Sequence, residues 1–131
     1  MRTAFLTPLI IAASVLAACG PGGPINVSNV QIGKALNPDN SVGAITTQFK
    51  PSDTFYVSVL TEEPGASTLT VRWRLNGQVV SEANKDVSYM RPAATEFHLQ
   101  NSGGFPPGPY QVDILVDGTL AESRNFRVID Q

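Results

Sequence analysis

The sequence predicts an all-β protein, a single antiparallel β-sandwich of seven to eight short strands. From residue 25 onward the apolar residues alternate with a period of two, and no segment sustains the spacing of an amphipathic helix. Turn residues recur about every ten residues, which is typical of a sandwich or barrel. All eleven glycines and nine of the ten prolines follow residue 18, and both residue types favour turns. A chain of 131 residues fits one domain.

Three strands are expected in the first half of the domain. Residues 25–32 alternate but slip by one position near Ser28, which indicates a β-bulge. After a turn, Ile45 and Phe49 are expected to share one face of a second strand. Residues 55–60 then alternate as a third strand that is buried on one side.

Residues 68–75 form the most regular segment. Its large apolar residues predict an inward face, and Arg72 and Arg74 belong to the outward face. Asn76-Gly77 closes this strand as a two-residue hairpin into the next strand, residues 78–81, because Asn and Gly adopt positive φ at low cost.

The second half contains three more strands and one region without a clear pattern. Asp117-Gly118 predicts a second two-residue hairpin, and the final strand is expected to carry another bulge. The three strands are residues 95–99, 110–116 and 119–128. The region without a clear pattern is residues 82–93.

The spacing of four core residues adds a resemblance. Trp73 lies fourteen residues after Val59, and Tyr110 lies two residues before Val112. In this spacing the chain resembles an immunoglobulin-like domain, where a Trp packs beside the inter-sheet disulfide and a Tyr precedes its second cysteine. The resemblance implies an immunoglobulin-like or fibronectin III-like sandwich in which valines replace the disulfide.

The N-terminus has the composition of an export signal. Arg2 is followed by an apolar segment, residues 4–18, that carries no charge and is too short for a membrane span. The segment ends in Leu16-Ala17-Ala18-Cys19, which resembles the lipobox of bacterial lipoproteins.

That resemblance implies a lipid on Cys19 and cleavage in front of it. Residues 1–18 would then be a signal peptide, residues 19–24 a lipidated cysteine with a flexible tether, and residues 25–131 the sandwich. Gly20 after the cysteine implies anchoring in the outer membrane. The alternative is ordinary cleavage near Ala18, which leaves Cys19 as an unpaired thiol.

The composition argues against several kinds of chemistry. Nine basic and eleven acidic residues give a net charge of −2, and the basic residues are scattered, so no nucleic-acid partner is expected. One His and one Cys cannot build a zinc site or a disulfide framework. The chain has no nucleotide, hydrolase or metalloprotease motif, and His98 is expected to be a solvated strand residue. We therefore expect no cofactor, no metal, no catalytic residues and no enzyme activity.

The candidate partner surface combines one sheet face with one loop. If the strand order is immunoglobulin-like, Asp113 faces Arg72 or Arg74, and Leu115 extends the same outward row. This row is either an ordinary ion-paired face or a protein-binding face. Phe105, in a proline-rich loop, is either an exposed anchor for a partner or a cap on the end of the sandwich.

Two functional classes remain open. In the first, the protein is a non-enzymatic, lipid-anchored module of the bacterial envelope that binds or assembles with another envelope protein. In the second, it is a lipoprotein inhibitor or immunity-type factor that blocks a toxin, a hydrolase or a secretion component. In both classes the lipid attaches the protein to the membrane, and the partner is another protein.

Overall fold

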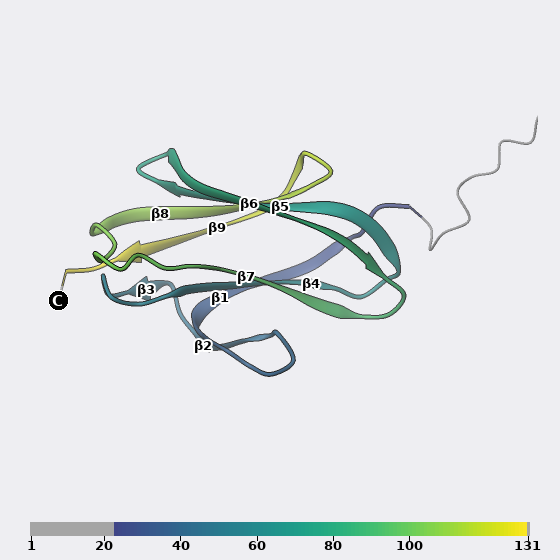
Figure 1. Ribbon diagram of the computed structural model, residues 1–131, viewed down its shortest axis with the longest axis horizontal. Helices are drawn as coiled ribbons and strands as arrows, with labels where there is room; N and C mark the ends of the chain where they lie inside the picture. Colours follow the sequence, from purple (N-terminus) through teal and green to yellow (C-terminus); the bar gives the residue numbers. More distant parts are fainter. Residues whose placement is uncertain (1–22, 131) are drawn as a thin grey trace, which may run out of the picture.

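The computed structural model describes residues 23–130, which form two packed β-sheets (Figure 1). This part of the chain contains nine strands and no helix, so the all-β prediction is confirmed and the expected seven or eight strands were too few. It also contains no cysteine and hence no disulfide. The strands are β1 (Val27–Leu36), β2 (Val42–Ile45), β3 (Gln48–Phe49), β4 (Phe55–Thr61), β5 (Gly65–Leu75), β6 (Gln78–Tyr89), β7 (Ala93–Leu99), β8 (Gly108–Val116) and β9 (Thr119–Val128).

One sheet has four strands in the order β2-β1-β4-β7, and the other has five in the order β3-β9-β8-β5-β6. Every pair is antiparallel except β3 with β9, which is parallel. The expected bulges are present, between Val27 and Asn29 in β1 and near Leu115 where β8 meets β9. Both predicted hairpin turns have positive φ at their central residues, and that of Asn76 is 51°.

The expected strand through Ile45 and Phe49 is wrong in one respect. The chain leaves the four-stranded sheet after β2 and joins the five-stranded sheet as β3, so the two residues belong to different sheets. Ala44, inside β2, has a φ of 48°, which interrupts the extended conformation one residue before the strand ends. Phe49 is fully buried, whereas Ile45 is 64% exposed.

Toward one end of the sandwich, the core consists mainly of aromatic rings. Phe55 stacks on Phe105 with ring centroids 3.9 Å apart and meets Tyr110 edge to face at 5.4 Å. Trp73 lies beside this group, 5.9 Å from Phe55. Valines and isoleucines from both inner faces complete the core, which supplies the main hydrophobic stabilisation.

The side of the sandwich between β6 and β7 is closed by side chains rather than by backbone pairing. Lys85 points inward from the edge strand β6, where its ammonium lies 4.7 Å from the centroid of the Phe97 ring and donates to the carbonyl of Glu96. Tyr89 and Thr95 form a second hydrogen bond across the gap. An inward charge on an edge strand opposes pairing with another chain, because a new strand would have to bury it.

The two ends of the sandwich differ in what they carry. Gly23 lies at the end where β5 begins, and its carbonyl accepts a hydrogen bond from the backbone of Ala66. The loop before β8 and the turn at Asn76 lie at the opposite end (Figure 1). No helix that could span a membrane is found between residues 23 and 130.

Candidate functional site

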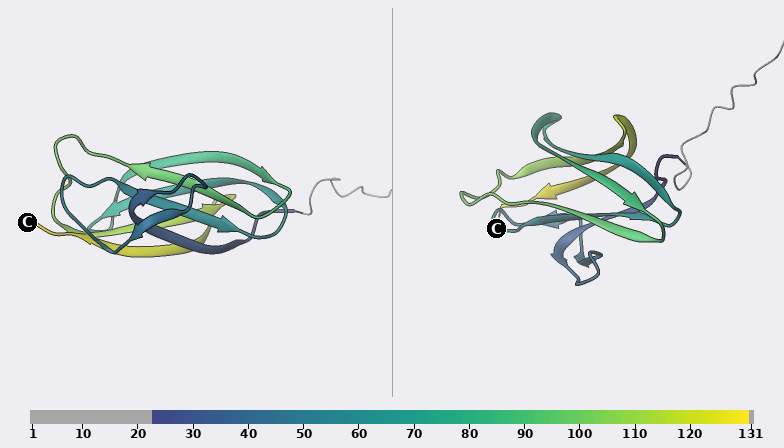
Figure 2. Two further views of the ribbon diagram at one scale, coloured as in Figure 1. Left: turned by 90° about the horizontal axis from the view of Figure 1, so that it is seen from below. Right: turned by 45° about the vertical axis from the view of Figure 1, so that its right-hand side comes forward.

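The outer face of the five-stranded sheet is polar and ion-paired. Both predicted outward arginines are on this face, where Arg72 pairs with Glu82 of β6 and Arg74 pairs with Asp113 of β8. The two hairpins of this sheet rise on the same outer side, so the face between them is concave (Figure 2). This curvature decides which outward residues remain accessible.

Asp113 is the centre of the hydrogen bonds on this face. Its carboxylate accepts from Arg74 Nε at 2.8 Å, from Gln111 Nε2 at 2.6 Å and from Ser123 Oγ at 2.8 Å. Burial alone would raise the pKa of this carboxyl. The three hydrogen bonds and the charge of Arg74 outweigh burial and hold the pKa below its ordinary value. Asp113 is therefore a buried residue that holds its neighbours on this face in place, and it is not exposed for contact with a partner.

Two apolar residues of the candidate partner surface are also buried, which corrects the prediction for Leu115 and selects, for Phe105, the expected alternative of a cap on the core. Leu115 is only 7% exposed, because it lies at the base of the β8–β9 hairpin opposite Leu120. Phe105 is 5% exposed and packs on Phe55, so it caps the core and is not an exposed anchor. Of the five predicted surface residues, only Arg72 and Arg74 keep part of their side chains in solvent.

Tyr110 fixes the loop that carries Phe105. Its hydroxyl donates to the carbonyl of Pro106 at 2.7 Å, and burial raises the pKa of this phenol. The loop thereby turns back into the core at the far end of the sandwich.

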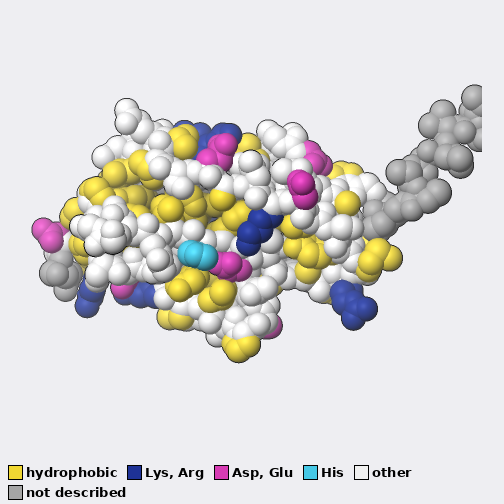
Figure 3. Space-filling view, in the orientation of Figure 1, with side chains coloured by type: hydrophobic (Ala, Val, Ile, Leu, Met, Phe, Trp, Pro, Cys, Tyr) yellow, Lys and Arg dark blue, Asp and Glu magenta, His cyan; other side chains and the backbone are white. Residues whose placement is uncertain are grey.

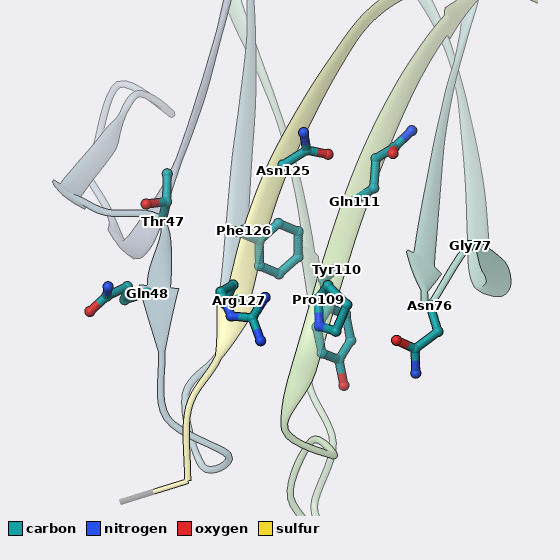
Figure 4. A pocket seen from close by; sticks show the side chains of 10 residues that line it. All are labelled: Thr47, Gln48, Asn76, Gly77, Pro109, Tyr110, Gln111, Asn125, Phe126 and Arg127. Atoms are coloured by element: carbon teal, nitrogen blue, oxygen red, sulfur yellow. The ribbon is translucent and has the colours of Figure 1, made fainter.

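A groove of about 580 Å³, lined mainly by residues with polar side chains, lies on the outer face at this same end (Figure 4). Strands β3, β9 and β8 and the β5–β6 turn contribute its walls, with Arg127 and Pro109 side by side between Gln48 and Asn76. The rings of Tyr110 and Phe126 belong to the core below it. The residues that line it are Thr47, Gln48, Asn76, Gly77, Pro109, Tyr110, Gln111, Asn125, Phe126 and Arg127.

An apolar pocket of about 330 Å³ opens on a different side, between the start of β6 and the end of β7. A band of hydrophobic side chains lies on this side beside the chain's single histidine (Figure 3). Val80 is 52% exposed at the pocket, and Val79 beside it is 49% exposed. The lining residues are Leu75, Val80, Ser81, Leu99, Gln100, Asn101, Phe105, Pro106 and Tyr110.

The groove and the pocket were not predicted from the sequence. Both are assembled from segments that are far apart in the chain, and their polar members are ordinary surface residue types. Only the position of Asn76 in a hairpin turn was available as a signal, and it identified a turn rather than a site.

His98 faces outward on the four-stranded sheet as expected, but it is not isolated. Its Nδ1 contacts the carboxylate of Glu96, and its ring centroid lies 5.9 Å from that of Tyr56. An acid and a base are therefore paired on this face. No cluster of three or more His, Cys, Asp or Glu that could hold a metal is present among residues 23–130.

Cys19, the predicted lipid attachment site, lies outside the described residues. The signal peptide and most of the tether lie there as well.

No protein-family model matches the chain, and no curated protein matches it. Two of the solved structures that are similar to this chain are the following. One is the Pseudomonas fluorescens alkylpurine DNA glycosylase AlkC bound to DNA containing an abasic site analogue, with 16% identity and a TM-score of 0.47 over 76% of this chain. The other is a β-glucosidase from Listeria innocua in complex with glucose, with 9% identity and a TM-score of 0.46 over 76% of this chain. The chain spans 30% and 16% of the lengths of these proteins.

The expectation that the chain is not an enzyme is contradicted, because both of these similar structures are enzymes. Glu96 and His98 contact each other on the outer face of the four-stranded sheet, and neither of them lines the groove or the apolar pocket. The likeness is one of fold, and it assigns no reaction to this chain.

Proposed function

We propose that this protein is a lipid-anchored binding module of the bacterial envelope. It attaches to the outer membrane through Cys19 and binds another envelope protein at the open side of the sandwich. The observation that carries the binding role is the apolar pocket beside the half-exposed Val79 and Val80. The lipobox-like sequence Leu16-Ala17-Ala18-Cys19 supports the anchor.

The domain is proposed to be an immunoglobulin-like or fibronectin III-like sandwich. The parallel pairing of β3 with β9 and the sheet order β9-β8-β5-β6 support this topology. So does the hydrogen bond from Tyr110 to a carbonyl four residues upstream. Val59 and Val112 are fully buried at the positions that the resemblance assigns to a disulfide.

The proposed partner adds an extended segment along the edge of β6. An edge strand offers unpaired backbone donors and acceptors, and a neighbouring pocket then selects a side chain of the added strand. Residues 78–81 carry no charge and lie next to the apolar pocket, whereas residues 82–86 contain three charged residues. Strand addition is therefore favoured at residues 78–81 and opposed further along β6.

The anchor and the pocket lie at opposite ends of the domain. Gly23 is beside the start of β5, and the pocket is formed around the end of β5 and the loop before β8 (Figure 1). An anchor that precedes Gly23 would therefore hold the binding side away from the lipid surface. One acyl chain binds only marginally, and two or three give durable attachment.

The binding role is tested by capture from detergent-solubilised envelopes with a tagged full-length chain. Val80→Asp places a charge at the mouth of the pocket, and Leu120→Asp is the matched control because Leu120 is a similarly exposed apolar residue on another hairpin. We expect the unchanged chain and Leu120→Asp to recover the same single protein and Val80→Asp to lose it. Equal recovery by all three chains would contradict binding at this pocket.

The anchor is tested separately by membrane fractionation of a Cys19→Ala variant. We expect the unchanged chain in the outer-membrane fraction and Cys19→Ala in the soluble fraction. Unchanged partitioning of the variant would show that the lipid proposal is wrong.

A further inference from the structure

The groove on the outer face of the five-stranded sheet opens on a different face from the protein-binding pocket proposed above, and Tyr110 is the one residue that lines both. It lies on the outer side of β3, β9 and β8, whereas the pocket opens between the edges of the two sheets. Its volume of about 580 Å³ lies within the usual range of small-molecule sites, about 300–1,000 Å³.

Side-chain amides are the main polar groups in this groove. The side chains of Gln48, Asn76 and Asn125 are exposed and make no hydrogen bond with any residue between 23 and 130. Gln111 uses its Nε2 to bind Asp113, which leaves its oxygen as an acceptor. A primary amide carries both a donor and an acceptor, so this set matches a ligand whose groups also do both, as hydroxyls do.

The groove has a positive charge and no carboxylate in its lining. Arg127 is its only charged lining residue, and it forms no ion pair within the described part of the chain. Asp113, an acidic residue on the same face, is already paired with Arg74. A planar guanidinium favours a carboxylate, because the two can form parallel hydrogen bonds.

Exposed aromatic stacking surfaces are lacking in the lining of this groove. Tyr110 and Phe126 contribute to its floor, but each is only 3% exposed, and their rings belong to the core. Single-stranded nucleic acids need accessible rings on which bases can stack. Pro109 instead offers a small exposed apolar surface beside Arg127 (Figure 4).

We infer that this groove binds an oligosaccharide that carries a carboxylate. The amides of Asn76 and Asn125 bind its hydroxyl groups, and Arg127 binds its carboxylate. Pro109 contacts the apolar face of a sugar ring. The choice of a cell-envelope sugar as the probe rests on the proposed location in the envelope. The inference that the groove binds an acidic oligosaccharide does not rest on that location.

The inference is tested by calorimetric titration of the full-length chain in detergent micelles with two disaccharides. The acidic probe is N-acetylglucosaminyl-N-acetylmuramic acid, and the neutral control is chitobiose, which lacks the lactyl carboxylate. We expect the acidic disaccharide to bind about tenfold more tightly, since one charge-assisted contact contributes roughly 1.4 kcal/mol, which is tenfold in Kd.

Variants then assign the two parts of the ligand. Arg127→Gln is expected to weaken the acidic disaccharide about tenfold and to leave the neutral one unchanged, whereas Asn125→Ala weakens both. Arg91→Gln is the matched control, because Arg91 is exposed and does not line the groove. Capture of an envelope protein at the pocket beside Val80 does not depend on Arg127 or Asn125. Failure of the disaccharide titration is therefore distinguishable from failure of the proposed function.

Three outcomes would overturn the inference. In the first, neither disaccharide binds at millimolar concentration. In the second, the two disaccharides bind equally and Arg127→Gln changes neither affinity. Displacement of the acidic disaccharide by an uncharged tetrapeptide at equal concentration would also count against a sugar and would assign the groove to a peptide.

Discussion

Asp113 lies directly opposite Arg72 in the pairing of β8 with β5, yet its ion-pair partner is Arg74, two residues further along, with Arg74 Nε 2.8 Å from Asp113 Oδ2. Arg72 is held by Glu82 on its other side, with Nε 2.7 Å from Oε1. Each of the two arginines therefore pairs with a different carboxylate. One pair is exposed toward the edge strand, and the other is covered in the middle of the sheet.

These two pairs are expected to differ in their contribution to stability. Arg74→Met leaves the buried Asp113 carboxylate without its charged donor and should cost about 1–3 kcal/mol of the free energy of unfolding. Arg72→Met removes a pair whose Glu82 side chain is 44% exposed and should cost less than about 1 kcal/mol. Urea denaturation of both variants measures the difference, and equal losses would contradict the distinct roles.

Acid should destabilise the protein partly through Asp113. Its pKa in the folded state is lower than in the unfolded chain, so the unfolded state takes up the proton first as pH falls. The stabilisation is fully present above the unfolded value of about 3.9 and is lost as pH falls through the lower folded value. The free energy of unfolding between pH 5 and pH 2.5 should therefore decline less steeply in Asp113→Asn. Glu63→Gln, which changes an exposed carboxyl outside this network, should decline as the unchanged protein does.

The Tyr110 hydroxyl is expected to stabilise the loop before β8. Tyr110→Phe removes the hydrogen bond to the carbonyl of Pro106 and should cost about 1 kcal/mol. Tyr56→Phe is the matched control, because no hydrogen bond of the Tyr56 hydroxyl is present among residues 23–130. A thermal melt that shows the same shift for both variants would indicate that this bond contributes nothing specific.

Phe105 is expected to behave as a core residue although it lies in a loop. Phe105→Ala removes a ring stacked on Phe55 and should cost about 3–5 kcal/mol. Phe105→Leu should recover part of this loss, because it refills much of the cavity. An exposed loop residue would instead change stability by less than about 0.5 kcal/mol, so a loss of that size in Phe105→Ala would place the ring in solvent.

Local signals in the sequence predicted the features that depend on neighbours along the chain. The alternation through Trp73 predicted its inward face, the pair Asn76-Gly77 predicted a hairpin, and the slip near Ser28 predicted a bulge. Each of these depends on backbone preference or side-chain period within a few residues.

The features that were missed depend on distant segments. Ile45 and Phe49 are separated into two sheets because β3 pairs with β9, which lies about eighty residues later. Leu115 is outward in sequence pattern but is only 7% exposed, and it lies opposite Leu120 on the paired strand β9. The candidate groove needs Gln48, Asn76 and Arg127 together, and no local pattern connects them.

The placement of the two ends of the sandwich has a mechanical consequence. A pull exerted between Gly23 and the groove acts along the strands, because the two points lie at opposite ends of the domain. The hydrogen bonds between β1 and β4 then resist together in shear rather than opening one at a time. Forced unfolding is governed by the rate of unfolding rather than by equilibrium stability. A domain tethered at Gly23 and loaded at its far end would therefore resist detachment of its first long strand more strongly than its small size suggests.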